Sequence, residues 1–230
     1  MSGHICLDHF YRTKASIILL VAAICFFNIP SMAQKNFVEG YIVELTGDTI
    51  QGKIDYRNWH RTPETIRFMR NGSKNTITKL SPLDIASFYV NDEYYIAKIL
   101  TLDRTAFANN ELMVNMLTYS RDRVIQKDTV FLNVLVRGKL DLYFLHDDND
   151  KPHYFVDNEF IEFDELILHQ YLSDVIKFAR VKTIIQRIER YKGQLTYYFK
   201  DCPELIQKAQ KLKFNRKDIT NIIYEYNDCK

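Results

Sequence analysis

The chain has 230 residues, of which 47% are hydrophobic and 26% are charged, and its 31 Lys and Arg nearly balance its 29 Asp and Glu. This composition is typical of a globular protein and excludes a wholly disordered or fibrous chain. The formal net charge of +2 lacks the basic excess of a nucleic-acid-binding domain, so nucleic acid is not an expected partner. The 15 Tyr and 15 Phe favour an aromatic, sheet-rich core.

The first 33 residues have the pattern of a signal peptide. Two basic residues precede an uncharged apolar run over residues 15–27, ASIILLVAAICFF, which is shorter than the roughly 20 residues of a membrane-spanning helix. Small residues follow at Ser31 and Ala33, so we predict cleavage between Ala33 and Gln34; the alternative is an uncleaved membrane anchor. Cleavage would leave an exported chain of net charge +1 that contains no membrane-spanning segment.

Two cysteines remain after this cleavage, Cys202 and Cys229. An oxidising compartment would allow them to pair, and closing a loop of about 28 residues stabilises a fold by about 3 kcal/mol in the chain-entropy model. The alternatives are two free thiols or a metal site, but the spacing is not CxxC and no histidine lies nearby. We therefore predict a structural disulfide.

Residues 34–158 are expected to form a β-rich domain, built as an antiparallel sheet or a partly open barrel. Alternating apolar residues around a turn predict hairpins at 37–56 and 66–80. The turn of the second hairpin, Asn71-Gly72, favours a two-residue type I′ connection. Five further strands are predicted, at 87–90, 94–102, 130–136, 140–145 and 154–156, with residues 104–128 left open between helix, strand and long loop.

Residues 159–230 are expected to form a helical C-terminal subdomain, which makes the fold class α+β. Apolar residues at helical spacing predict amphipathic helices at 205–212 and 219–226. Residues 175–188 and 191–199 are also expected to be helical. The predicted disulfide would join the start of one amphipathic helix to the end of the other.

A phosphate-binding loop is suggested by Gly47 to Lys53, which match the pattern GxxxxGK. Ile54, however, occupies the position of the Ser or Thr that would bind Mg²⁺, and the lysine continues into a strand instead of a helix. No nucleotide cofactor is therefore expected. Gly47 is interpreted as a turn residue and Gly52 as a bulge or close-packing position within a strand.

Catalytic and metal motifs are absent from the sequence. The segment from His146 to Asp150, HDDND, lacks the Gly and Glu of an EF-hand loop, so a solvated turn and no metal are expected. The histidines after the signal form no HExxH, and no GxSxG is present, so no catalytic residue is assigned. A site assembled from distant residues stays open. These histidines are His60, His146, His153 and His169.

A ligand surface is suggested by Trp59, the single tryptophan, together with Tyr56 and Arg57. Aromatic faces beside a cation can bind a glycan or a peptide. The alternative is ordinary packing beside the end of a strand.

Several short segments carry a resemblance to known proteins, at residues 40–43, 47–54, 56–59, 63, 130–132, 134–138, 191–195, 201–203 and 226–229. They resemble a group of uncharacterised exported proteins of Bacteroidota. In some relatives a similar region precedes an outer-membrane β-barrel, which implies a periplasmic or outer-membrane-associated location. Because this sequence stops at Lys230, we expect docking to a separate envelope partner in place of direct insertion. The resemblance carries over no catalytic residue.

These observations favour a non-catalytic envelope module that binds a protein or a glycan. One alternative is an envelope hydrolase with a dispersed active site, and another is an accessory subunit of an outer-membrane assembly. A cluster of histidines with carboxylates in the folded protein would favour the hydrolase.

Overall fold

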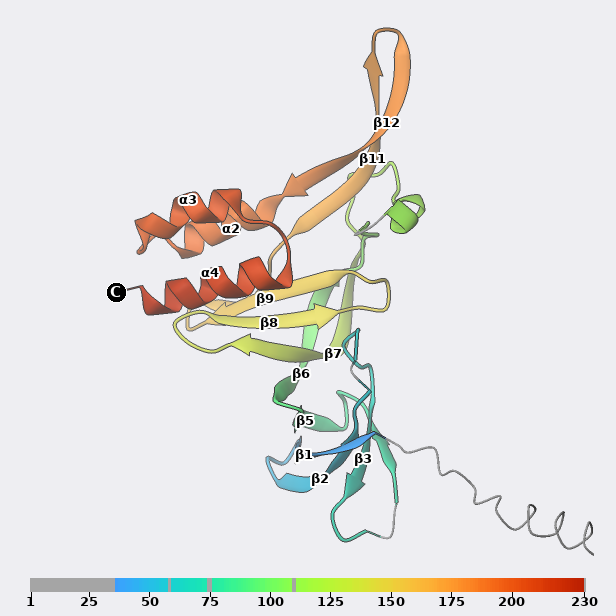
Figure 1. Cartoon of the computed structure of the whole chain (residues 1–230), viewed down its shortest axis with the longest axis vertical. Coiled ribbons are helices and arrows are strands. Elements are labelled where there is room, and N and C mark those ends of the chain that lie inside the picture. The colour runs from blue at the N-terminus through green and yellow to red at the C-terminus, as the bar shows by residue number, and fades with distance from the viewer. Residues whose placement is uncertain (1–35, 58, 74–75, 109–110, 230) are drawn as a thin grey trace, which may run out of the picture. The chain divides into compact units, whose positions relative to one another are not determined.

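The computed structural model of the chain describes residues 36–57, 59–73, 76–108 and 111–229 (Figure 1). The expected signal peptide, residues 1–33, and its cleavage position between Ala33 and Gln34 lie outside these residues. Strands dominate the chain as far as Glu189, and three helices follow. The α+β class predicted from the sequence is confirmed.

Ten strands form one antiparallel sheet, in the spatial order β10-β9-β8-β7-β6-β5-β1-β2-β3-β4. The chain winds outward from β1 to β4, then returns to pair β5 with β1, and runs outward again to β10. β4 and β10 are thus the two edges of an open sheet. The strands are β1 (Phe37–Glu44), β2 (Thr49–Asp55), β3 (Ile66–Arg70), β4 (Thr78–Leu80), β5 (Ile85–Val90), β6 (Glu93–Asp103), β7 (Ile125–Val136), β8 (Asp141–His146), β9 (Pro152–Asn158) and β10 (Ile161–Glu165).

Both predicted hairpins are confirmed, with one difference. β1 pairs with β2 around a turn in which Gly47 has a φ of +95°. β3 pairs with β4, but residues 71–77 connect them, so the loop is longer than the two-residue turn expected of Asn71-Gly72. Within the segment left open, 104–128, lie the 3₁₀ helix η1 (Glu111–Met116) and the first residues of β7.

The helix expected over residues 175–188 is wrong. This segment belongs to a second, two-stranded antiparallel sheet formed by β11 (Leu168–Lys177) and β12 (Arg180–Glu189). The segment is rich in Val, Ile and Thr, whose branched side chains suit a pleated strand better than a helix. The turn residues Phe178 and Ala179 carry none of the usual Gly or Asn signals of a hairpin, which hid the turn. Helices in the expected subdomain 159–230 therefore begin only at Arg190.

The three helices are α2 (Arg190–Tyr198), α3 (Pro203–Lys211) and α4 (Arg216–Asp228). Pro203 opens α3, where its missing N–H costs no hydrogen bond. Asn215 caps the N-terminus of α4, and its side chain accepts a hydrogen bond from the Asp218 backbone N–H at 2.9 Å. Cys202 and Cys229 lie at disulfide distance, with their Cα atoms 6.3 Å apart, as the sequence predicted.

β8 is a nearly continuous run of apolar residues because both of its faces are buried in the fold. Leu142 and Phe144 pack in a cluster with the helices, while Tyr143 and Leu145 point to the other face and pack with Phe155. A third cluster lies around β1, β2, β3 and β5. Among the described residues, no helix has the length and hydropathy to cross a membrane.

Candidate functional site

Trp59 is partly buried and packs against three other aromatic rings. Its ring lies edge-on to those of Tyr56 at 4.9 Å, Phe88 at 6.0 Å and Tyr95 at 6.0 Å. The indole is half-buried against the apolar cluster of the first strands. This arrangement is the packing alternative that the sequence left open for this residue.

Arg57 is also engaged within the chain. Asp55 is buried, and its two carboxylate oxygens accept hydrogen bonds from Arg57 at 3.2 and 3.0 Å and from Arg67 at 3.1 Å. The two guanidinium groups neutralise a carboxylate that would be costly to bury alone. Of the three residues predicted as a ligand surface, Tyr56 and Trp59 thus contact each other, while Arg57 binds Asp55 at the end of β2.

A groove with a volume of about 570 Å³ lies between four segments that are far apart in the sequence and Arg104, which directly follows β6. We call it the Arg104 groove. The loop before β3, the turn before β5, the strand β7 and the turn after β8 supply its walls. Its lining residues are Thr62, Pro63, Glu64, Ser81, Pro82, Leu83, Arg104, Gln126, Asp128, Thr129, Val130, Phe131, Leu145, His146, Asp147, Asp148 and Asn149.

The charges of the Arg104 groove are predominantly negative. Arg104 forms ion pairs with Asp128 at 2.8 Å and with Asp147 and Asp148 at 3.4 Å each. Glu64 is a fourth carboxylate in the lining and is exposed. Asp147 is buried, so the accessible carboxylates of the groove are Glu64, Asp128 and Asp148, which still outnumber Arg104 and favour a ligand that carries positive charge.

A buried histidine fixes the wall of this groove. The ring of His153 is fully buried, its Nε2 lies 3.1 Å from Asp147 Oδ2, and its Nδ1 lies 2.7 Å from Glu165 Oε1. Burial alone would lower the pKa of His153, but the two carboxylates outweigh burial and raise it. In the same way, His153 and neighbouring donors lower the pKa of Asp147 against the opposing effect of burial. His153 is therefore a cation held between two anions.

A second buried ion pair joins the same turn to the end of β6. Lys151 Nζ lies 3.2 Å from Asp103 Oδ1, and both side chains are almost fully buried. Asp103 also accepts hydrogen bonds from Arg123 at 2.8 Å and from the Thr105 backbone N–H at 2.9 Å. Burial would raise the pKa of Asp103, but Lys151 and these donors lower it to about 2. These buried pairs anchor Asp147 and Lys151 at the two ends of the turn after β8.

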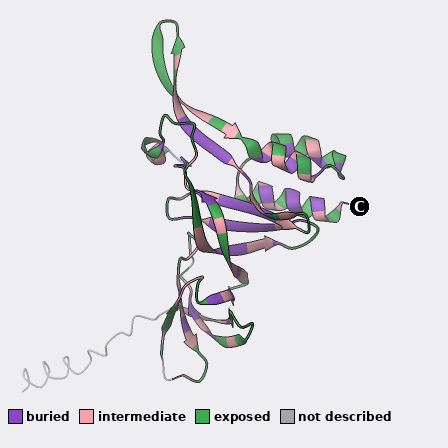
Figure 2. Ribbon diagram, turned by 180° about the vertical axis from the view of Figure 1, so that it is seen from behind, coloured by how far each residue is buried: buried purple, intermediate pink, exposed green. Residues whose placement is uncertain are grey.

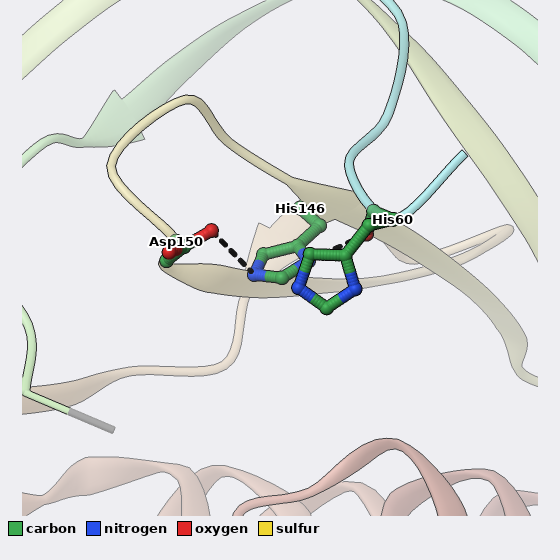
Figure 3. A group of neighbouring side chains, drawn as sticks. All are labelled: His60, His146 and Asp150. Carbon is green, nitrogen blue, oxygen red and sulfur yellow. Dashed lines mark hydrogen bonds and ion pairs between the residues drawn. The ribbon is translucent and has the colours of Figure 1, made fainter. Parts of the chain in front are cut away.

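Two further histidines meet a carboxylate beside the groove (Figure 3). His60, His146 and Asp150 each offer one ligand atom, and these atoms lie within 4.8 Å of one another. His146 Nδ1 is 2.9 Å from the His60 backbone oxygen, so an Nδ1–H proton would leave Nε2 facing Asp150 Oδ1 at 3.9 Å. Arg61 also binds Asp150, at 2.7 Å. The sequence expectation of a plain solvated turn at 146–150 therefore missed these contacts.

This donor set can hold a metal ion only after a small rearrangement. Imidazole nitrogens and carboxylate oxygens bind Zn²⁺ at about 2.0–2.2 Å, so the ligand atoms would have to approach one another, and Arg61 would have to share Asp150. Cys202 and Cys229 lie near Glu204 in a second such group, but the cysteine pair already accounts for its two sulfurs.

The described histidines do not form a nucleophile–base pair. Within the described ranges, no serine or threonine hydroxyl and no cysteine thiol is hydrogen-bonded to a histidine ring. Both nitrogens of His153 are occupied by carboxylates. His169 is buried outside the groove, stacks on Tyr171 at 5.8 Å, and has a pKa lowered by burial. The arrangement is suited to binding charge more than to acyl transfer.

The groove residues were not identified from the sequence because they come from separate segments. Arg104 falls in the stretch whose structure was left open, and its partner Asp147 is 43 residues away. A signal did exist, since Lys151 directly precedes β9 and His153 lies within it, next to the apolar run Tyr154–Val156. Charged residues within an apolar strand indicate buried ionic partners. Comparison of the chain with protein-family models, curated proteins and solved structures found no match.

Proposed function

We propose that the protein is an exported protein of the cell envelope that acts as a non-catalytic binding module, with the Arg104 groove as its binding surface. Support for export comes from the apolar run at 15–27, the small residues before Gln34 and the resemblance to exported proteins. Support for binding comes from the groove itself.

One observation carries the proposal: four carboxylates line a groove with one arginine, and a buried ion pair with His153 holds one of them, Asp147, in place. A preorganised acidic groove loses little conformational entropy when a cationic group enters it. The partner is therefore an envelope protein that inserts a lysine or arginine side chain. A glycan is a less suitable ligand than a basic protein segment, because Trp59 packs edge-on against three other rings.

Titration of a fluorescein-labelled oligolysine peptide, followed by fluorescence anisotropy, tests this proposal. The double variant Glu64→Gln/Asp148→Asn removes two exposed groove charges and should weaken oligolysine binding by about tenfold or more. The matched control Asp122→Asn/Glu159→Gln removes two exposed carboxylates outside the groove and should bind as the wild type does. Equal weakening by both double variants, or no binding by the wild type, would refute the groove as a cation site.

A hydrolase is the second candidate, and the cluster of His60, His146 and Asp150 is the observation that favours it. Two imidazoles and a carboxylate beside a groove are a donor set that zinc hydrolases use, with a further position kept for water. Isothermal titration with Zn²⁺ tests this candidate. It requires one bound ion that is lost in His146→Ala and kept in His169→Ala; unchanged affinity in His146→Ala would remove the candidate.

A further inference from the structure

The far end of the β11–β12 hairpin is an exposed structure with little support from the rest of the chain. The two strands pair residue by residue from Leu168 with Glu189 to Lys177 with Arg180. At the base, Leu168 and Tyr171 are buried, but the end of the hairpin is exposed on both strands (Figure 2). The exposed end, residues 175–182, is called the hairpin tip.

The hairpin tip is amphipathic. Residues that pair across antiparallel strands lie on the same face, and neighbours along a strand lie on opposite faces. Ile176 pairs with Val181, which places two apolar side chains together on one face. Lys177 pairs with Arg180 on the other face. Lys182 lies on this second face too, where it pairs with Val175.

The apolar side chains of the tip are almost entirely in contact with solvent. Phe178 is 99% exposed, Ile176 is 76% exposed and Val181 is 67% exposed. The hairpin is drawn at the top of Figure 1, where β11 and β12 meet in the turn that carries Phe178. Three large apolar side chains at one exposed end indicate a contact surface, whereas single exposed residues need no explanation.

Two further features of the tip are unfavourable in the isolated chain. Phe178 and Ala179 have φ values of 50° and 58°, a left-handed conformation in which hairpins normally place Asn or Gly. Lys177 and Arg180 bring like charges directly opposite each other, which destabilises a strand pair. Among the residues that the structure describes, none forms an ion pair with Lys177, Arg180 or Lys182.

We propose that the hairpin tip docks on the surface of a lipid bilayer that contains anionic headgroups. Ile176, Phe178 and Val181 would enter the boundary between headgroups and acyl chains. The basic face would bind lipid phosphates, which would relieve the repulsion between Lys177 and Arg180. The charge of the tip favours a membrane over a protein partner, because apolar residues and three unpaired cations coincide on eight consecutive residues. This inference is independent of the Arg104 groove.

Vesicle flotation with the full mature chain tests the proposal. We expect binding to phosphatidylcholine vesicles that contain about 30% phosphatidylglycerol, and binding at least about tenfold weaker to pure phosphatidylcholine. Phe178→Ser should weaken binding to the anionic vesicles by about tenfold or more. Phe160→Ser is the matched control, since Phe160 is 85% exposed in a turn outside the hairpin, and it should leave binding unchanged.

The variant Lys177→Gln/Arg180→Gln separates charge from apolar contact. It should weaken binding to anionic vesicles and abolish the preference for them over neutral vesicles. Because these side chains make no buried contact, circular dichroism should show all variants folded. Equal binding by Phe178→Ser and Phe160→Ser would overturn the proposal. Failure of the wild type to bind either vesicle would also overturn it and would assign the tip to a protein partner.

Discussion

Replacing Glu165 with Gln removes one of the two carboxylates that enclose the buried His153. The glutamate accepts a hydrogen bond from His153 Nδ1 at 2.7 Å and another from the Asp103 backbone N–H at 3.1 Å. Glutamine has nearly the same shape but only one acceptor oxygen, so its amide NH₂ would face one of these two N–H donors. The variant therefore removes a charge and creates a donor–donor contact in the interior.

The expected cost follows from burial of this ion cluster. Removing one partner of a buried pair costs about 3–5 kcal/mol, and the lower end applies because His153 keeps Asp147. In a chain of this size, about 3 kcal/mol corresponds to a melting temperature lower by roughly 6–12 °C. Glu162→Gln is the matched control, because Glu162 lies on the same strand but is exposed, and its variant should melt close to the wild type.

The pH dependence of the free energy of unfolding distinguishes a cluster of paired charges from a cluster of uncharged side chains that only pack together. The folded-state pKa of His153 is raised above its ordinary value of 6.5, so its contribution is complete below about pH 6.5 and declines as the pH rises through the folded pKa. The folded-state pKa values of Asp147 and of Asp103, the latter about 2, lie below 3.8, so their contributions are present above about pH 3.8 and are lost as the pH falls. The free energy of unfolding should therefore change little between these two pH limits.

Urea unfolding across this pH range is the assay. The wild type should lose stability on the alkaline side by at most about 1.4 kcal/mol per pH unit for this one proton. Glu165→Gln should show a shallower alkaline decline, because His153 loses a carboxylate that raises its pKa. If Glu165→Gln were as stable as Glu162→Gln, with an unchanged pH profile, the assignment of a buried imidazolium would be wrong.

Two further predictions concern the disulfide and the glycines. Replacing Cys202 and Cys229 together with Ser should lower the free energy of unfolding in urea by about 3 kcal/mol, and an intact mass that reduction leaves unchanged would show that the pair is not bonded. Gly52→Ala should destabilise the protein, because a Cβ there would lie 2.4 Å from the Met69 backbone oxygen and 2.5 Å from the Phe68 ring. Gly193→Ala, with nothing within 4 Å of its Cβ, should instead stabilise α2 by about 0.5–1 kcal/mol; a Gly52→Ala variant that melts no lower than Gly193→Ala in thermal unfolding would contradict this packing.

Local patterns predicted most of the sheet. The β1–β2 hairpin followed from a turn flanked by alternating apolar residues, and Gly52 was correctly assigned to close packing within a strand. The interpretation of residues 47–53 as a turn followed by a strand is also confirmed. These features depend on neighbours within about 11–18 residues, which is the window over which a hydrophobic pattern is informative.

The errors have physical causes. The β11–β12 hairpin was mistaken for a helix because its turn uses Phe178 and Ala179 at positive φ. The Arg104 groove was not identified because its charges meet only after the sheet forms. Asp147 was interpreted as solvated, although it is buried between Arg104 and His153, because sequence alone does not reveal a partner 43 residues away. Long-range pairing of this kind is set by topology and not by local propensity.

The function proposed for the Arg104 groove is to bind a basic segment of an envelope protein. Zero-length carbodiimide cross-linking in native envelopes tests it directly, because this chemistry joins a carboxylate only to an amine in contact with it. Peptide mass spectrometry should find Glu64 or Asp148 joined to a lysine of an envelope protein, and the joined species should disappear in Glu64→Gln/Asp148→Asn. Cross-links confined to carboxylates outside the groove, such as Asp122 and Glu159, would contradict the account.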